Sequence, residues 1–359
     1  IGGTLSVTST KVYNRTNAAA ITDTSLLTLV NVPAGDANDA TKVALTSLTA
    51  TYDSKNVGVG KTVIVATAAL TGTTSGNYTI TTTGAPTTTA DITQRPITLG
   101  FTLSNKTYDG TVNASVSFTD TRISGDILTV SGTPTYPDKN VGTNKTVTAT
   151  NMSISGTDAA NYSFNTTATA TASILVRTLA VTISASSKTY DGNASASVVF
   201  SDNRVAGDIF TVSGTATFAN KVYGLSKTVT ATGITLTGTD AANYSPNTST
   251  TTTANITKRP LTVTITASNK IYDRTTTASV TYADDRVSGD VLVIASTPTF
   301  SDKNVGTSKL VTANSISVTS TDSGNYTWNT TATTNADITK RLMTIGITPS
   351  NKVYNASTT

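Results

Sequence analysis

Asp158-Ala159-Ala160-Asn161-Tyr162 is the stretch that decides the fold, because it returns at a fixed interval along the chain. It recurs unchanged at residues 240–244, and with two changes as Asp322-Ser323-Gly324-Asn325-Tyr326. The three tyrosines are 82 residues apart, and Asn77-Tyr78 is a fourth pair of the same kind. Self-similarity at a period of tens of residues is the signature of a tandem repeat protein.

Two further markers precede each Asn-Tyr pair in a fixed order. The first is a lysine two residues before a tyrosine, with tyrosines spaced by 95, 82, 82 and 82 residues, at Tyr13, Tyr108, Tyr190, Tyr272 and Tyr354. The second is Lys-Asn-Val-Gly in three of its four copies, always starting 23 residues before the tyrosine of the Asn-Tyr pair, at Lys55, Lys139, Lys221 and Lys303. Three markers in one order, four times over, do not arise by chance.

The markers divide the chain into four modules and the start of a fifth. We expect module 1 at residues 1–94, module 2 at 95–176, module 3 at 177–258 and module 4 at 259–340. Residues 341–359 repeat the opening of a module, so we expect them to form the first strand of a following one. No Gly/Ser-rich linker separates the modules, which predicts close coupling between neighbours.

Each module reads as all-β. In module 2 the alternation of apolar and polar residues predicts seven strands, at 97–103, 114–118, 127–130, 133–136, 146–154, 162–164 and 168–174. That number of short strands fits an immunoglobulin-like β-sandwich. The Asp-Ala-Ala-Asn-Tyr stretch fits the corner before strand F of that fold, where a tyrosine hydroxyl bonds to upstream backbone.

The fold class expected is therefore a row of tandem immunoglobulin-like β-sandwich modules arranged as a rod. At about 3.3 Å per strand residue, each module would measure ~30–40 Å and the four together ~150 Å. We expect six repeat tyrosines to be structural, namely Tyr108, Tyr162, Tyr190, Tyr244, Tyr272 and Tyr326.

Composition argues against catalysis. The 359 residues include no Cys and no His, and their acidic residues are all Asp, so thiolate and imidazole chemistry is excluded. Thr and Ser make up about a third of the chain, whereas Glu is absent and Gln occurs once, which disfavours helices. We expect no enzyme activity, no cofactor and no catalytic residue.

Charge and hydropathy exclude two kinds of partner. The net charge is +4, and Lys and Arg are spread evenly, which indicates a solvated surface rather than a nucleic-acid footprint. The longest apolar run, at residues 291–295, is far too short to span a bilayer. We therefore expect neither nucleic-acid binding nor membrane insertion in this segment.

The markers together resemble the YDG-type repeats of large bacterial surface proteins, including filamentous-haemagglutinin-like adhesins. The resemblance is full at Tyr108-Asp109-Gly110 and Tyr190-Asp191-Gly192 and weaker at Tyr13, Tyr272 and Tyr354, where Asn or Arg intrudes. It covers essentially the whole chain. It implies an extracellular tandem β-sandwich stalk or filament at the bacterial surface, and it implies no catalytic residue.

Three recurrent motifs invite a site interpretation. An Asp-x-Arg-x-x-Gly-Asp motif offers weak metal or glycan candidates at Asp120, Asp126, Asp202, Asp208, Asp284 and Asp290. Because calcium sites rarely include a cation, an arginine held by two carboxylates is the simpler interpretation. Lys106, Lys188 and Lys270 could crosslink to nearby Asp109, Asp191 and Asp273, or could lie along the surface over the tyrosine. Thr-rich stretches could bind sugar or ice or carry O-glycans, or could simply coat the strands with hydroxyls.

Two functions remain open. The first is a structural, non-catalytic stalk or filament segment of an extracellular adhesin or fibre. The alternative is a binding module for glycans or a neighbouring cell surface, with contacts in the module 1 insertion at residues 24–50. Residues 341–359 suggest either a longer polypeptide or separate subunits joined by strand addition. We favour the longer polypeptide, since residues 4–8 already supply module 1 with a first strand.

Overall fold

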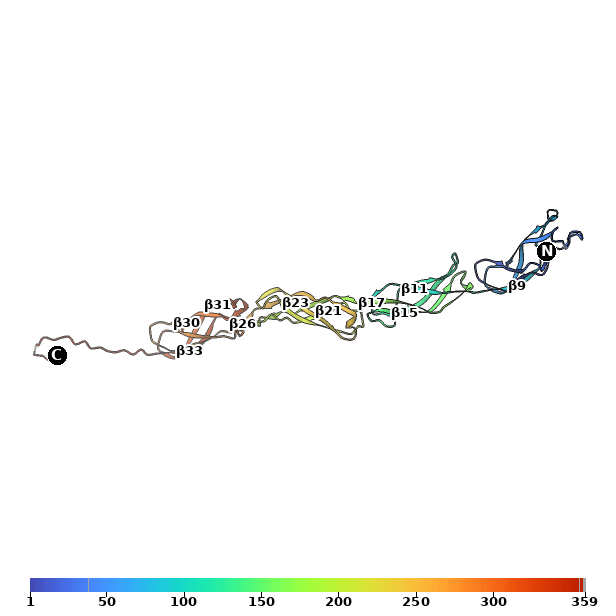
Figure 1. Ribbon diagram of the computed structural model, residues 1–359. Helices are drawn as coiled ribbons and strands as arrows, with labels where there is room; N and C mark the ends of the chain where they lie inside the picture. Colours follow the sequence, from blue (N-terminus) through green and yellow to red (C-terminus); the bar gives the residue numbers. More distant parts are fainter. Residues whose placement is uncertain (38, 355, 358–359) are drawn as a thin grey trace. The chain divides into compact units, whose positions relative to one another are not determined.

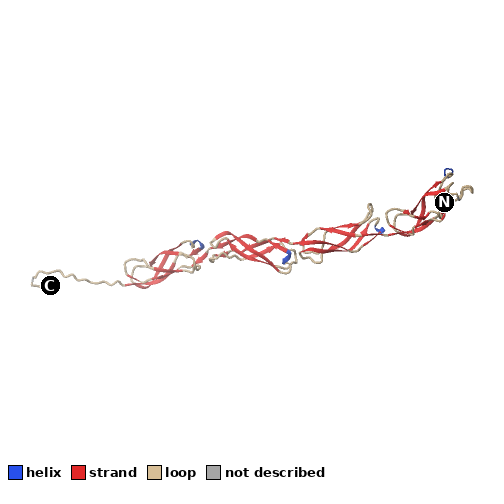
Figure 2. Ribbon diagram, viewed as in Figure 1, coloured by secondary structure: helices blue, strands red, loops and turns tan. Residues whose placement is uncertain are grey.

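A computed structural model describes residues 1–37, 39–354 and 356–357. In this part the chain is all-β: Figure 2 shows strands in each of the four modules, and helix occurs only as short 3₁₀ turns. Close contacts group the chain into two units, one of Ile1–Arg177 with Ala242–Tyr244 and one of Thr178–Ala241 with Ser245–Thr359. Among the described residues, no helix has the length and apolar character needed to cross a membrane.

Module 2, in the first unit, shows the repeat in full (Figure 1). Its main sheet has four strands in the order β12-β17-β15-β14, of which only β12–β17 is a parallel pair. A second ladder, β11–β13, contacts β17, and β10 pairs in parallel with β16. The elements are β10 (Arg95–Ile97), β11 (Leu99–Leu103), β12 (Lys106–Thr107), β13 (Val116–Asp120), β14 (Thr129–Thr135), β15 (Gly142–Ser155), η2 (Ala159–Asn161), β16 (Tyr162–Phe164) and β17 (Ala168–Leu175).

Modules 3 and 4, which lie in the second unit except for Ala242–Tyr244, repeat this topology with sheets β20-β25-β23-β22 and β28-β33-β31-β30. In module 3 the elements are β18 (Arg177–Leu179), β19 (Val181–Ala185), β20 (Lys188–Thr189), β21 (Val198–Asp202), β22 (Thr211–Phe218), β23 (Gly224–Thr237), η3 (Ala241–Asn243), β24 (Tyr244–Pro246) and β25 (Ser249–Thr257). In module 4 they are β26 (Arg259–Leu261), β27 (Thr264–Ala267), β28 (Lys270–Ile271), β29 (Val280–Ala283), β30 (Val293–Phe300), β31 (Gly306–Thr319), η4 (Ser323–Asn325), β32 (Tyr326–Trp328) and β33 (Ala332–Thr339).

Module 1 departs from the repeat in its sheet and in its insertion. Its sheet has five strands in the order β3-β9-β8-β7-β4, and the chain start pairs with β6 inside the insertion. The elements are β1 (Gly2–Gly3), β2 (Ser6–Val7), β3 (Thr10–Val12), β4 (Ala18–Ala19), β5 (Ile21–Asp23), β6 (Leu27–Thr28), β7 (Ala44–Tyr52), β8 (Gly58–Thr71), η1 (Ser75–Asn77) and β9 (Thr87–Thr93).

Alternating side chains build each core. In β15, Val147 and Ala149 are fully buried while the residues between and beside them are more exposed. Ile174 of β17 and Tyr136, just after β14, join them inside the sheet. Threonine fills most of the other positions, where its branched side chain suits a strand and its hydroxyl meets water.

Three of the seven expected strands differ in the structure. Expected strand 97–103 is two strands that separate at Thr98, because β10 pairs with β16 whereas β11 pairs with β13. Conversely, expected strands 127–130 and 133–136 are one strand, β14, whose register shifts between Ser131 and Thr133. The parallel pairs β10–β16 and β12–β17 are a further difference from the antiparallel sheets of an immunoglobulin sandwich.

The expected first strand in residues 341–359 is not formed over the described residues 341–354. Its apolar side chains, Leu342, Met343, Ile345 and Ile347, are exposed. The equivalent strands β10 and β26 each pair with a strand that begins 67 residues later in the chain. Counted from residue 341, the corresponding position lies beyond residue 359. Asn355 and residues 358–359 lie outside the described residues.

Candidate functional site: the joint between modules

The sequence markers meet where one module passes into the next. We call this contact region a joint. The preceding module supplies a tyrosine half, consisting of the Lys-x-Tyr marker and the Lys-Asn-Val-Gly turn. The following module supplies a corner half, consisting of its Gly-Asp turn and its Asn-Tyr pair. The joint of modules 1 and 2 lies in the first unit, and that of modules 3 and 4 in the second.

At the joint of modules 1 and 2, two buried tyrosines meet over a buried carboxylate. The rings of Tyr13 and Tyr162 lie edge to face, with centroids 5.5 Å apart and planes at 75°. The Tyr162 hydroxyl donates to Asp126 Oδ2 at 2.5 Å and accepts the backbone N–H of Ile123 at 3.2 Å. The Tyr162 hydroxyl thus supplies a hydrogen-bond donor to a buried carboxylate.

This environment disfavours ionisation of both phenols. Burial raises the pKa of Tyr13 to about 12, and the negative charge of Asp126 adds to the effect. Burial and the hydrogen bond to Asp126 likewise raise the pKa of Tyr162 to about 12. Among the described residues, the buried Tyr13 hydroxyl has no hydrogen-bond partner.

Arg15 crosses the joint from a position two residues after the marker tyrosine Tyr13, where modules 2 and 3 have glycine. Its φ is +69°, a conformation that costs a non-glycine residue energy. Its guanidinium donates to the carbonyls of Ser124 at 2.8 Å and Gly125 at 3.0 Å, and its Nε lies 3.1 Å from Asp126 Oδ1. These three contacts offset the backbone strain.

Asn161 joins the turn of the preceding module to the corner. Its Oδ1 accepts the N–H of Val57 at 2.9 Å, and its Nδ2 lies 3.3 Å from Asn56 Oδ1. Beside it, Lys55 contacts Asp158 Oδ1 at 3.1 Å. The backbone N–H of Ile127 and then Lys55 lower the pKa of Asp158. A backbone N–H and a lysine ammonium of module 1 therefore each meet an oxygen acceptor of module 2.

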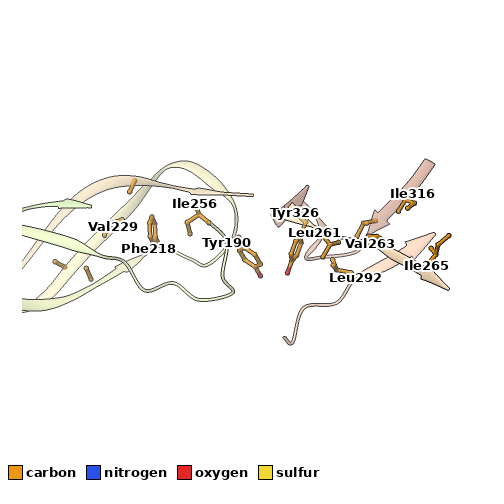
Figure 3. Close-up of a cluster of buried hydrophobic side chains, with 14 of the residues drawn as sticks. Tyr190, Phe218, Val229, Ile256, Leu261, Val263, Ile265, Leu292, Ile316 and Tyr326 are labelled. Atoms are coloured by element: carbon orange, nitrogen blue, oxygen red, sulfur yellow. The ribbon is translucent and has the colours of Figure 1, made fainter. Parts of the chain in front are cut away.

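The joint of modules 3 and 4 repeats this geometry, and here one carboxylate serves both modules. Figure 3 shows Tyr190 and Tyr326 facing each other, with centroids 5.5 Å apart and planes at 76°. Asp290 accepts the Tyr326 hydroxyl at 2.6 Å and the Tyr190 hydroxyl at 2.9 and 3.0 Å. The Tyr223 N–H donates to Asn325 Oδ1 at 2.8 Å. Burial raises the pKa of both tyrosines.

The apolar core runs through this joint without a break. One cluster of buried side chains includes Val229 and Ile256 of module 3 and Leu261 and Val263 of module 4 (Figure 3). The glycine of the Tyr-Asp-Gly turn allows this approach: Gly192 has φ +81°, and a Cβ there would lie 2.7 Å from Val287 Cγ1. An alanine at this position would therefore clash with Val287.

The expected structural tyrosines occupy joints in five of six cases. Tyr108 and Tyr244, both in the first unit, form a third edge-to-face pair at 5.4 Å. Tyr272 alone is only half-buried. The hydroxyls of Tyr162 and Tyr326 do bond to upstream backbone, yet each also donates to a buried aspartate, a partner that the sequence did not suggest.

The six metal candidates fall into two groups of three with different roles. Arg122 binds Asp120 through two nitrogens and donates to the Leu128 carbonyl at 2.6 Å, so it is held by one carboxylate rather than two. Asp126 faces the tyrosines instead. Asp202 and Asp284 bind Arg204 and Arg286 in the same way, and Asp208 and Asp290 are buried. Within the described residues, no three acidic side chains gather as a metal ion would need.

The three crosslink candidates are ion pairs at hydrogen-bonding distance. The ammonium nitrogens of Lys106 and Lys188 lie 2.8 Å from Asp109 and Asp191. Lys270 holds the pKa of Asp273 at about 2 through its hydrogen bond at 2.9 Å. Each lysine lies over an aromatic ring of its own sheet, as Lys106 does over Tyr136, rather than over the marker tyrosine.

The module 1 insertion carries two features that sequence reasoning missed. A cleft of about 530 Å³ is lined by insertion residues including Leu27, Asp39 and Val43. Asp36 accepts the Tyr78 hydroxyl at 2.8 Å, as Asp126 accepts that of Tyr162. The signal was present, since Ala34-Gly35-Asp36 repeats the Gly-Asp turn without its arginine.

Comparison with protein-family models matches the YDG domain four times, at residues 3–89, 93–171, 176–253 and 257–334. Comparison with curated protein sequences gave no match. The chain is similar to the I9–I11 tandem of titin at 12% identity and a TM-score of 0.19, over 69% of this chain and 98% of that one. It is similar to the N-terminal four Ig domains of Dscam1 isoform 9.44 at 10% identity and 0.17, over 94% and 98%. Both TM-scores are too low to support any conclusion. With four matches that cover most of its length, the chain belongs to the YDG domain family.

Proposed function

We propose that this chain is a structural, non-catalytic segment of an extracellular stalk or filament on a bacterial surface protein of the adhesin type. The observation that carries the proposal is the use of the repeated markers at the joints. Tyr190, Asp290, Asn325 and Tyr326 contact neighbouring modules rather than an open cleft. The recurring residues couple neighbouring modules, the charge of the chain is low, and its strands are rich in hydroxyl groups. These three properties suit a spacer at the cell surface.

A spacer must stay extended when isolated. We expect solution scattering of the chain to give a maximum dimension of at least ~150 Å, the length of four coupled β modules at ~3.3 Å per strand residue. Antibodies against the chain should also label intact bacteria. A compact particle, or label only after permeabilisation, would contradict the proposal.

A second function is favoured by one observation. Module 1 alone carries an insertion, and a cleft of about 530 Å³ lies in it, lined by Asp36 and Asp39 among apolar residues. A binding module for glycans or a neighbouring cell surface would concentrate its contacts here. A glycan array probed with the intact chain and with Asp39→Asn tests this: binding that the variant loses would favour the adhesin alternative.

A further inference from the structure

Every module closes its main sheet with the same parallel pair of strands. In module 2 the short strand β12 pairs with β17, the last strand of the module, with Thr107 opposite Leu175. The backbone N–H of Tyr108 extends this ladder to the Leu175 carbonyl at 2.9 Å. The other modules pair β3–β9, β20–β25 and β28–β33 in parallel as well. Their marker tyrosines make the same 2.9 Å bond, from Tyr13 to Thr93, Tyr190 to Thr257 and Tyr272 to Thr339.

A second parallel ladder lies where the chain enters modules 2 and 4. β10 pairs with β16, starting with Arg95 opposite Tyr162, and β26 pairs with β32 in the same way. A single residue separates each entry strand from the last strand of the preceding module, Gln94 before β10 and Lys258 before β26. Tension along the chain therefore reaches these ladders without first straightening a linker.

The direction of these ladders decides how they respond to tension. In β12–β17, one strand leads back toward the start of the chain and the other leads on toward its end, and both run the same way. Opposed pulls then slide the two strands past each other and load their evenly spaced hydrogen bonds together. An antiparallel hairpin pulled at its paired ends instead opens one bond pair after another. The β14–β15 hairpin of the same module, which ends at the pair Thr129 and Ser155, provides that contrast.

Lys106 braces the short strand β12 from its other side. Its ammonium lies 2.8 Å from Asp109 and 2.7 Å from the Thr111 carbonyl, in the loop that follows β12. That loop bonds to the far edge of the sheet, where the Tyr136 N–H donates to the Val112 carbonyl at 2.7 Å. β12 is therefore held to both edges of the sheet although it is two residues long. Lysines at the same position bind loop carbonyls in the other modules, namely Lys11, Lys188 and Lys270.

We propose that this chain bears mechanical load, with the parallel ladders and the lysine brace of its modules acting as clamps under tension. The modules differ in length and in the residue that follows Tyr-Asp or Tyr-Asn, yet all four keep the terminal parallel pair, the tyrosine bond and the lysine. The Lys-x-Tyr marker thus has two tasks at the clamp, since its lysine braces the strand and its tyrosine closes the ladder. The inference rests on the proposed stalk function and adds that the stalk carries force.

Single-molecule pulling of the 359-residue chain in two directions tests the proposal. The chain has no Cys, so pairs of introduced cysteines place the handles at chosen points. Gln94→Cys with Val176→Cys pulls module 2 through its entry and exit, whereas Thr129→Cys with Ser155→Cys pulls the β14–β15 hairpin at its paired ends; all four residues are exposed. At one pulling speed, we expect the first pair to give an unfolding force at least twofold higher. Equal forces, or a higher force for the hairpin, overturn the proposal.

Two matched lysine variants test the brace with the handles at the module ends. Lys106→Met keeps the stem that lies over Tyr136 and removes the ammonium. The control is Lys145→Met on β15, because Lys145 binds Asp138 at 2.6 Å and the Asn140 carbonyl at 2.9 Å and is similarly buried. Both variants lose one ion pair and one carbonyl bond, but only Lys106 lies on a loaded strand.

Forced unfolding follows the unfolding rate, so the readout is the lifetime of module 2 at constant force. We expect Lys106→Met to shorten this lifetime at least fivefold and Lys145→Met to leave it within twofold. Equal lifetimes of the two variants overturn the clamp. That result, or a force independent of direction, leaves the stalk function standing, because that function is tested by the length of the chain and its place on the bacterium.

Discussion

Tyr190→Phe should destabilise module 4, although Tyr190 belongs to module 3. The substitution keeps the ring against Tyr326 and removes only the hydroxyl that donates to Asp290 at 2.9 and 3.0 Å. A hydrogen bond to a charged group contributes ~1.5–3 kcal/mol. Because Asp290 keeps the Tyr326 hydroxyl at 2.6 Å, we expect the lower end of that range, about 1.5 kcal/mol.

The chain provides a probe for this test. Its only tryptophan, Trp328, lies in module 4, where its Nε1 donates to the Ile316 carbonyl at 3.0 Å. Tryptophan fluorescence during urea unfolding therefore reports on that module. With an m-value of ~1 kcal/mol/M for a small domain, the midpoint should fall by ~1.5 M. Tyr13→Phe, the same substitution in module 1, should leave it unchanged. A Trp328 midpoint unaffected by Tyr190→Phe would refute the coupling across the joint.

Three further predictions concern the joints. The pKa of Tyr326 is raised from 10 to about 12 in the folded state, so its contribution to stability is complete below pH 10 and is lost as the pH rises toward 12. The free energy of unfolding should fall by about 1.4 kcal/mol per pH unit in that range. Tyr326→Phe should remove this pH dependence from the unfolding transition reported by Trp328. Gly192→Ala should lower the Trp328 midpoint by an equivalent of ~1–2 kcal/mol, since its Cβ would meet Val287 at 2.7 Å with φ +81°. Lys55→Ala should cost only ~0–1 kcal/mol, and the loss should disappear in high salt on thermal unfolding, because its ion pair with Asp158 is partly exposed.

The sequence predicted the all-β class and the repeat because both depend on local patterns. Alternation in β15 and the fixed spacing of the tyrosines are visible without any partner strand. The choice of which strands pair with each other is not visible in this way. The change of partner at Thr98 and the merging of two expected strands in β14 depend on which strands lie beside them.

The joint could be predicted only in part for a similar reason. The repeat spacing identifies Asp126 and Asp290 as recurrent acids and Tyr162 and Tyr326 as recurrent phenols, but it does not show that they contact a neighbouring module. Their hydroxyl–carboxylate bonds span 36 residues, and the Tyr190 bond to Asp290 spans 100. The useful signal was the common interval: residues that recur together with one period often serve one surface, and that surface here lies between modules.

The division of each joint into two halves also bears on how such a gene can change. Every module carries the tyrosine half and the corner half on separate segments of its own sequence, and three modules share a period of 82 residues. An in-frame deletion or duplication of 82 codons would bring the same two halves together again, with the aromatic pair and the shared aspartate restored. Recombination between repeats can therefore lengthen or shorten the protein in whole steps without leaving a defective contact behind.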